Sequence, residues 1–327
     1  MIYLSFCIPT YNRSTYLRQT IESIISQKEF TDSDEVEVIV SDNNSTDDTN
    51  CIMSLYTEKY PTKIKYYRNS ENIKDYNYEK VLSYGNGQIL KLHNDTLTLL
   101  PNSLGKIINI VKYSIQGNYF PYFTDGYLRD ILKPVVCNNK YDFLELVSYR
   151  ITWIGSFSIY RDSFNEIETF SDRAELMLCQ VDVIFKLLEK GVTFLIIPDK
   201  LFSTVSPLSK GGYNLPKVFL INYFIILRDY FDRESDIVFL EKQLRKTAFE
   251  FVLPWLIRIY INKLLFGKKY EFEFNGYQII IKESFNTKTL MHFECKLFLG
   301  IFYSMLIIIS KNALHKIRIT RKMLSFK

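Results

Sequence analysis

The first 200 residues alternate short runs of β-forming residues with segments of helical periodicity, and this alternation constrains the fold most strongly. Val36, Val38 and Val40 occupy every second position of one expected strand. Leu17 and Ile21 recur at helical spacing before it. Strands that alternate with helices favour an α/β fold with a mostly parallel sheet flanked by helices. Ligands bind beyond the carboxyl ends of such strands, so the polar turns there are the expected sites of chemistry.

The alternation of strand-like and helical segments continues to a polar segment at residues 203–212. Long apolar and basic helical segments follow it. We therefore expect an α/β domain over residues 1–205 and a mainly helical C-terminal region over residues 206–327. Within the first domain, strands are expected at residues 3–8, 36–40, 64–67, 89–92, 156–160 and 192–197. Helices are expected from Ser14, over 76–84, after Pro101 and along 177–188.

The net charge of +5 comes from the C-terminus, where residues 311–327 hold six Lys or Arg and no acid. The apolar run Leu297–Ile309 precedes this basic tail and is shorter than the roughly 20 residues that span a bilayer. We expect no full transmembrane helix. The run is either a buried helix of the C-terminal region or, with the tail, a peripheral contact with the membrane surface. Nucleic-acid binding has only the tail charge in its favour, so we expect none.

Five widely spaced cysteines, without a C-x-x-C pair, argue against a disulfide framework and a structural zinc site. Residues 1–9 lack a basic segment and a small-residue cleavage site, and are expected to form a strand and not a signal peptide. These features favour a cytoplasmic location. The sequence does not indicate an oligomeric state.

Two segments in order carry a family resemblance. Ser5–Arg13 reads SFCIPTYNR and precedes an amphipathic helix, and Val36–Asp47 reads VEVIVSDNNSTD. Both resemble the first two strand-and-loop segments of family 2 glycosyltransferases of GT-A fold, and bacterial O-antigen and capsule enzymes of the abequosyltransferase-like kind look most similar. The resemblance covers roughly residues 3–200, and residues 206–327 resemble no family that we can name.

The resemblance implies a donor site for a nucleotide sugar in these loops. The family's aspartate after the second strand binds the base or ribose, and this role carries over to Asp42. Pro9, Tyr11 and Arg13 would line the base pocket. Alternatively, the Asp42 turn only caps a helix, since such caps are common.

A metal site is implied after the strand at residues 89–92. There the family has an Asp-x-Asp or a related motif, and this chain has His93-Asn94-Asp95. Asp95 would hold Mn²⁺ or Mg²⁺ with oxygen ligands of the diphosphate, and Asn94 would contact the donor. His93 replaces the usual first acid, so it either ligates the metal, donates to a phosphate, orients Asp95 or is a satisfied strand-end histidine.

Three further residues are candidates near the loops of the implied donor and metal sites. Asn72 and Asn77 lie where the family has an Asn-rich segment, and Lys91 is close to the strand end. They could contact donor hydroxyls or phosphate, or could be surface loop residues.

The catalytic base is expected near the start of a later helix, where the family has an acidic run. The matching segment Glu175–Asp182 reads ELMLCQVD, and its nearest carboxylate is Asp182, with Glu175 as the second candidate. Either acid could instead be an exposed residue of an amphipathic helix. Trp153, just before this region, would stack on a sugar or fill the core.

The resemblance therefore implies an inverting transfer of a sugar to a glycan hydroxyl in surface polysaccharide synthesis. The acceptor would be lipid-linked and the enzyme would work at the inner face of the cell membrane. A sugar-phosphate nucleotidyltransferase is a weaker reading, because Pro9–Arg13 contains no glycine. A catalytically degenerate binding or scaffolding subunit is the other alternative, since His93 and Gln180 replace acids.

Overall fold

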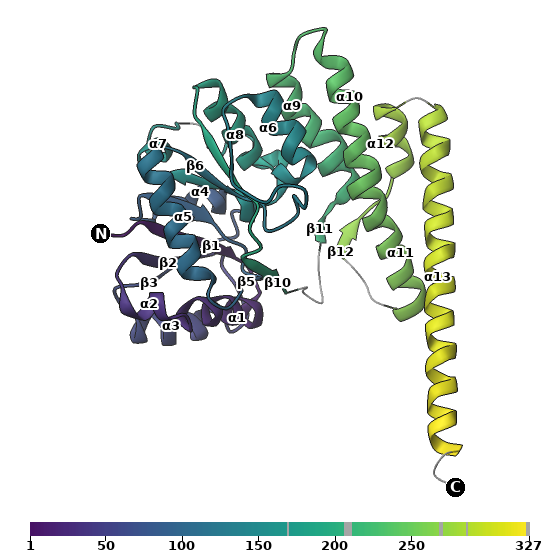
Figure 1. The fold of residues 1–327 in the computed structure, drawn as a ribbon, viewed down its shortest axis with the longest axis horizontal. Coiled ribbons are helices and arrows are strands. Elements are labelled where there is room, and N and C mark those ends of the chain that lie inside the picture. The colour runs from purple at the N-terminus through teal and green to yellow at the C-terminus, as the bar shows by residue number, and fades with distance from the viewer. Residues whose placement is uncertain (169, 206–210, 268–270, 286, 325–327) are drawn as a thin grey trace. The chain divides into compact units, whose positions relative to one another are not determined.

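The computed structural model describes residues 1–324 except 169, 206–210, 268–270 and 286, and it describes no side chains at 211, 271, 287 or 309–327. The chain divides into two compact units, Met1–Pro207 and Leu208–Lys327. Figure 1 shows the strands of the first unit among helices, and a second unit made mostly of helices. Each unit is described by itself below.

The first unit is built on a five-stranded sheet of order β3-β2-β1-β4-β8. The strands β1 to β4 run parallel, and β8 is antiparallel to β4. Their bounds are β1 Leu4–Thr10, β2 Val36–Asp42, β3 Ile64–Arg68, β4 Ile89–Leu92 and β8 Ser158–Tyr160. The mostly parallel α/β fold that the alternation predicts is confirmed.

Strand order reverses beside β1, and this reversal determines where a site can form. From β1 the chain adds β2 and β3 on one side, and then returns to add β4 on the other. Sheets of this class bind ligands at such a reversal, so the loops that follow β1 and β4 mark the expected crevice at the carboxyl end of the sheet.

Apolar side chains on one face of the sheet form the core with two helices. Phe6 and Ile8 of β1 join residues of α1 (Ser14–Ile25) and α5 (Ser103–Gly117) in one buried cluster. Cys7, between them, points to the opposite face and is also fully buried. Further helices of this region are α2 Lys28–Asp32, α3 Thr49–Lys59, α4 Tyr76–Ser83 and α7 Arg161–Asn165.

A second, smaller sheet has the order β6-β9-β7, and a separate two-stranded ribbon joins β5 and β10. Of these strands only β9 (Phe194–Ile197) is expected from the sequence. The others are three or four residues long, and β6 contains Pro121, so their patterns are too short to recognise. Their bounds are β5 Leu97–Leu99, β6 Phe120–Phe123, β7 Val135–Cys137 and β10 Phe202–Thr204.

The remaining segments of the first unit pack beside these sheets. The helix α8 (Cys179–Glu189) carries the region where the catalytic base is expected. Two short 3₁₀ turns, η1 and η2, lie before β8. The turns are η1 Ser148–Thr152 and η2 Ile154–Ser156. Two further helices are α6 Lys140–Val147 and the 3₁₀ helix η3 Ala174–Leu176.

The second unit is mainly helical and also contains a small parallel pair, β11 (Gly211–Asn214) and β12 (Glu271–Glu273). A methyl group added at Gly300 would collide with Ile257, so this glycine lets α13 approach α11 closely. The helices are η4 Lys217–Asn222, α9 Tyr223–Tyr230, α10 Asp236–Lys246, η5 Thr247–Val252, α11 Leu253–Phe266, α12 Tyr277–Ser284 and α13 Thr287–Leu324, of which η4 and η5 are π-helical.

Within the part of the chain that the structure describes, one helical stretch is long and apolar enough to cross a membrane. Lys288–Ile308 of α13 has 21 residues and a mean hydropathy of 1.5, and 11% of it is buried. This stretch is longer than the 13-residue run Leu297–Ile309 because it also includes residues 288–296, some of them polar. By length and composition alone, a core helix of a soluble protein passes the same test.

Candidate functional site

The register between β1 and β4 brings the loops after these strands together. Cys7 pairs with Leu92, so Thr10 and Asp95, each three residues further on, lie opposite one another. The Thr10 hydroxyl donates to Asp95 Oδ2 across 2.9 Å. Arg13 donates to Asp95 Oδ1 across 3.1 Å. The crevice edge thus combines one carboxylate, one guanidinium and one hydroxyl from two separate loops.

Asp95 is almost wholly buried, with 3% of its surface exposed. Burial raises the pKa of its carboxyl, while the charge of Arg13 and the hydrogen bonds from Thr10 and Arg13 oppose this shift. The Thr20 hydroxyl of α1 donates to the Asp95 carbonyl across 2.9 Å. These contacts fix the loop after β4 against the start of α1.

Asp42, at the end of β2, is fully buried and accepts two hydrogen bonds within the protein. Its Oδ1 accepts from the backbone N–H of Ser45 across 2.8 Å, which closes a turn ahead of α3, the helix that begins at Thr49. Its Oδ2 accepts from the Tyr66 hydroxyl across 2.6 Å, and Arg68 Nε lies 4.0 Å away. Burial and the hydrogen bond to Asp42 raise the pKa of Tyr66.

The loop after β1 lies beside this turn. The side chain of Asn12 accepts from the Thr46 N–H across 2.7 Å, and the Asn12 N–H donates to Ser45 Oγ across 2.8 Å. Asn12 has a φ of 51°, a left-handed conformation that asparagine tolerates better than most residues. Tyr11 is 44% exposed and Pro9 is partly exposed, so the predicted base-pocket residues have surface that a ligand can reach.

An asparagine network links β2 to the loop before α4. Asn43 donates to Asn72 Oδ1 across 2.8 Å, and its own Oδ1 accepts from Asn69 across 3.3 Å. Asn77 donates to the Ser41 carbonyl across 2.9 Å and is buried, whereas Asn72 is exposed. Sequence reasoning singled out Asn72 and Asn77 and missed Asn43, although it follows Asp42 directly.

Lys91 is placed differently from the expectation that it contacts donor phosphate. It is fully buried, and its ammonium donates to the carbonyls of Gly155 (2.5 Å) and Leu92 (3.1 Å). The rings of Phe123 and Phe202 flank the ammonium. Burial lowers the pKa of Lys91 to about 7. This placement gives Lys91 a structural role in holding η2 against β4.

His93 is only half satisfied as a strand-end histidine, because its Nδ1 is buried without a hydrogen-bond partner among the described residues. It is fully buried, and its Nε2 lies 2.7 Å from the Leu97 carbonyl, so Nε2 carries the proton. The rings of Phe6 and Phe202 pack edge-on against the imidazole. Burial and the nearby charge of Lys91 lower the pKa of His93 well below 6.5, which keeps the ring neutral.

These placements do not fit the metal pair that the sequence predicts. The His93 ring is enclosed by phenylalanines, and both Asp95 oxygens accept hydrogen bonds from protein donors. Among the described residues, no group of three His, Cys, Asp or Glu side chains is placed to hold a metal ion. Asp95 alone has the oxygen chemistry that Mn²⁺ or Mg²⁺ prefers, and Arg13 is the cation beside it.

Asn94 lies next to Asp95 and faces the η2 turn. Its Oδ1 is buried without a hydrogen-bond partner in the described structure, and a methyl group at Gly155 would lie 3.0 Å from it. The Trp153 ring contacts the same position and packs, partly buried, against the core. Asn94 therefore offers an unused acceptor beside the crevice.

The two candidate bases differ in environment. Asp182 lies in the first turn of α8, is 2% exposed, and pairs with Lys186 across 2.7 Å. Glu175, on η3, is exposed. Gln180 donates to the Thr152 carbonyl across 2.9 Å and so connects α8 to η1.

Sequence reasoning missed a third acid in this region. Asp75 precedes α4. Burial, and after it the charge of Asp75, raise the pKa of Cys179 at the start of α8. Burial raises the pKa of Asp75 itself to about 6. No sequence pattern marked it, and Cys179, on which its charge acts, lies 104 residues further along the chain.

Comparisons with known proteins indicate a family and a fold for this chain. Residues 5–164 match the family described as Glycosyl transferase family 2. The chain is 37% identical over 152 residues to the abequosyltransferase RfbV of Salmonella typhimurium, which covers 46% of this chain and 41% of that protein. It is 33% identical over 108 residues to the GalNAc(5)-diNAcBac-PP-undecaprenol β-1,3-glucosyltransferase of Campylobacter jejuni, covering 32% of this chain and 33% of that protein. The matched segments thus span less than half of either relative.

Solved structures show the same fold at low sequence identity. The crystal structure of S. aureus TarS has a TM-score of 0.56 and 14% identity, covering 92% of this chain and 54% of that chain. A structure of TarS 1–349 in complex with UDP has a TM-score of 0.51 and 14% identity, covering 92% and 89%. This similarity confirms the expected GT-A fold with a helical C-terminal region.

Proposed function

We propose that the chain is an inverting glycosyltransferase, because residues 5–164 match the family described as Glycosyl transferase family 2. It moves a sugar from a nucleotide-sugar donor to a hydroxyl of a glycan acceptor in bacterial surface polysaccharide synthesis. The relative RfbV, by name an abequosyltransferase, supports a polysaccharide role. The observation that carries the proposal is the meeting of Arg13 and Asp95 at the crevice between β1 and β4.

In this proposal the loops after β1 and β2 bind the nucleotide. Tyr11 and Pro9 present partly exposed surface to the base, and the turn closed by Asp42 fixes the loop geometry. Arg13, whose side chain is 40% exposed, binds the diphosphate. The TarS complexes with UDP and UDP-GlcNAc make uridine nucleotides the first donors to test.

The chemical step requires one base and one stabilised leaving group. The acceptor hydroxyl oxygen forms a bond to the anomeric carbon while the bond from that carbon to the diphosphate oxygen breaks. The hydroxyl proton passes to a carboxylate, for which we propose Asp182, with Glu175 as the second candidate. Arg13 stabilises the negative charge that develops on the departing nucleoside diphosphate.

A divalent metal, if used, would be held by Asp95 and the donor diphosphate, because His93 is enclosed in the core. Such an ion would supply further charge stabilisation to the leaving group. Asp95 would have to exchange its hydrogen bond from Arg13 for this contact.

We propose a lipid-linked acceptor, since the name of the Campylobacter jejuni relative includes a diphospho-undecaprenol acceptor. The protein would then work at the cytoplasmic face of the membrane. The apolar stretch of α13 and the basic residues of 311–327, whose side chains lie outside the described residues, would supply a peripheral contact. Removal of residues 311–327 should weaken flotation with anionic liposomes, and unchanged flotation would exclude the tail as the anchor.

A catalytically degenerate nucleotide-sugar-binding subunit is the second candidate. It is favoured by the neutral, enclosed His93 and by Gln180, which bonds to the backbone at the position where the family has an acid. Binding of a donor without turnover would support this alternative.

The decisive experiment is a donor screen followed by a turnover assay. The melting temperature is measured with UDP, GDP, CDP and dTDP sugars, and release of the nucleoside diphosphate is then measured with the best ligand and a lipid-linked glycan fraction. We expect one nucleotide class to raise the melting temperature and to be turned over. If none binds, the proposed function is wrong.

A further inference from the structure

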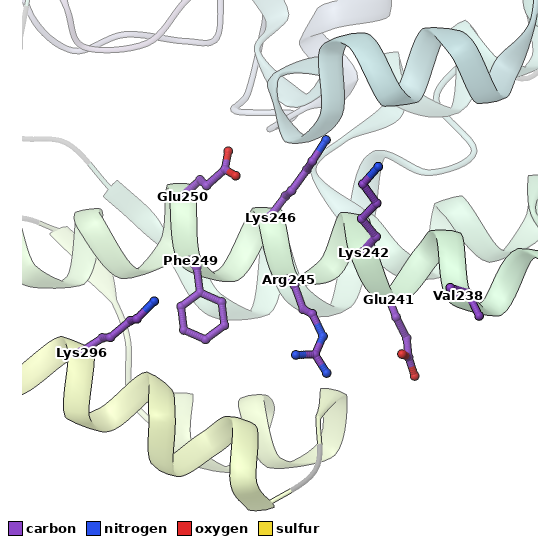
Figure 2. A pocket seen from close by; sticks show the side chains of 8 residues that line it. All are labelled: Val238, Glu241, Lys242, Arg245, Lys246, Phe249, Glu250 and Lys296. Atoms are coloured by element: carbon purple, nitrogen blue, oxygen red, sulfur yellow. The ribbon is translucent and has the colours of Figure 1, made fainter.

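The second unit contains a cavity of about 530 Å³ that opens among α10, η5 and α13 (Figure 2). Four cationic and two acidic side chains line it, so its charge is positive. The lining residues are Val238, Glu241, Lys242, Arg245 and Lys246 of α10, Phe249 and Glu250 of η5, and Lys296 of α13. We call this cavity the α10–α13 pocket.

Two cations, one aromatic ring and the carboxylate of Glu241 lie on the side of the pocket that faces α13. Figure 2 shows Lys242, Lys246 and Glu250 extending to the other side. Figure 2 shows Arg245 and Phe249 extending towards α13, and Lys296 extending from α13 towards Phe249. The Lys296 ammonium lies 5.0 Å from the centroid of the Phe249 ring. Arg245 and Lys296 are both exposed. A guanidinium and an ammonium beside an apolar ring form a suitable surface for a phosphate group attached to an apolar chain.

The pocket adjoins an exposed apolar surface on the same helix. Leu299 and Tyr303 follow Lys296 by three and seven positions, so all three lie on one side of α13. The exposed residues of this apolar strip are Phe298 (71%), Leu299 (61%), Phe302 (55%), Tyr303 (67%) and Leu306 (48%). Soluble proteins rarely leave so many large apolar side chains together in water.

The opposite side of α13 packs within the second unit. Phe293 and Leu297 are buried there, and Gly300 permits close approach to Ile257 of α11. The helix is therefore held by one side and presents the apolar strip on the other. This is the arrangement of a helix that lies in a membrane interface.

We infer that the α10–α13 pocket binds the phosphate headgroup of an anionic membrane lipid, with Arg245 and Lys296 as its ligands. The acyl chains of that lipid lie along the apolar strip. Charge complementarity supports this occupant, because a positive pocket at the margin of an apolar surface matches a lipid's anionic head and apolar tail. The inference rests on the proposed membrane contact, and it assigns a headgroup site distinct from the basic residues of 311–327.

The test uses the full chain, so that residues 311–327 remain present in every variant. The double variant Arg245→Gln/Lys296→Gln removes the pocket cations. The matched control Lys217→Gln/Arg228→Gln removes one lysine and one arginine from exposed positions of the same unit outside the pocket. Binding is measured by flotation and titration with phosphatidylglycerol-containing vesicles, and with vesicles of phosphatidylcholine alone, at one ionic strength.

We expect wild type and control to bind the anionic vesicles equally, and the pocket variant to bind about 10- to 30-fold more weakly. Replacement of Phe298 and Phe302 by Ser should weaken binding to both vesicle types. Equal binding by the pocket variant and its control would overturn the inference. Tight binding of inorganic pyrophosphate by wild type without vesicle binding would also overturn the inference, because it would indicate a site for soluble phosphates. Dimerisation that the apolar substitutions abolish, without any vesicle binding, would overturn it as well.

Nucleotide-sugar binding is measured on the same variants. It depends on the first unit, so the pocket variant should retain it. An unchanged thermal unfolding profile of the full chain shows that the second unit of the variant is also folded. A wild type that binds anionic vesicles but no nucleotide sugar would contradict the proposed function and leave the headgroup site standing.

Discussion

The guanidinium of Arg13 lies 3.1 Å from the carboxylate of Asp95, although 82 residues separate them in the chain. The two residues follow β1 and β4, the neighbouring strands at which the strand order reverses. Asp95 is 4% exposed at its side chain and Arg13 is 40% exposed, so the pair has one accessible member. A diphosphate entering the crevice would meet Arg13 first and compete with Asp95 for it.

The exposed member of this pair can be tested by Arg13→Gln. We expect the affinity for the preferred nucleoside diphosphate to fall about 10- to 100-fold, the usual loss for one hydrogen bond to a charged group. Titration calorimetry measures the affinity. Arg18→Gln, an exposed arginine on α1, the helix that follows Arg13, is the control and should bind as wild type does. Equal affinities in the two variants would remove Arg13 from the donor site.

Asp182→Asn tests the proposed base. The change preserves shape and removes the proton acceptor, so transfer should fall by about 10²- to 10⁴-fold while donor affinity stays within about twofold. Single-turnover assays and donor titrations separate the two effects. Glu175→Gln tests the second candidate, and Asp162→Asn, exposed on α7, is the control. If both Asp182→Asn and Glu175→Gln remain fully active, the base is another group, for which Asp75 is the next residue to substitute.

His93→Leu distinguishes a structural histidine from a metal ligand. Loss of the bond to the Leu97 carbonyl leaves that buried group without its donor, so the free energy of unfolding should fall by about 1–3 kcal/mol. The affinity for Mn²⁺ in the presence of nucleotide should not change. Urea denaturation and manganese titration provide the two readouts. A variant with normal stability and weakened Mn²⁺ binding would restore His93 as a ligand.

The buried Lys91 should make the free energy of unfolding depend on pH. Its pKa is lowered from 10.5 to about 7 by burial, so the unfolded chain binds one more proton than the folded protein between these values. Stability should therefore rise with pH through this window, by up to about 1.4 kcal/mol per pH unit. Urea unfolding at several pH values measures the slope. Lys91→Met should reduce the slope, and an unaltered slope in that variant would show that another group causes it.

The sequence predicted the elements whose patterns are local. Valines at alternate positions placed β2, helical spacing placed α1, and Ile89–Leu92 was expected as the strand that the structure contains. These patterns follow from side chains two or four positions apart sharing a face, which the chain itself determines. The polar turns after β1, β2 and β4 were predicted in the same way, together with the residues to examine in them.

The environment of each site residue was decided only by the tertiary structure. Lys91 was a candidate because it lies close to the end of a strand, and His93 because the family resemblance places an acid at its position. The structure encloses them, since Lys91 binds the carbonyl of Gly155, 64 residues away, and His93 lies between rings from two distant strands. Asp95 meets Thr10 and Arg13 through the register of β1 with β4. Burial, pairing and proton affinity depend on such long-range neighbours, and the spacing of residues along a chain carries no information about them.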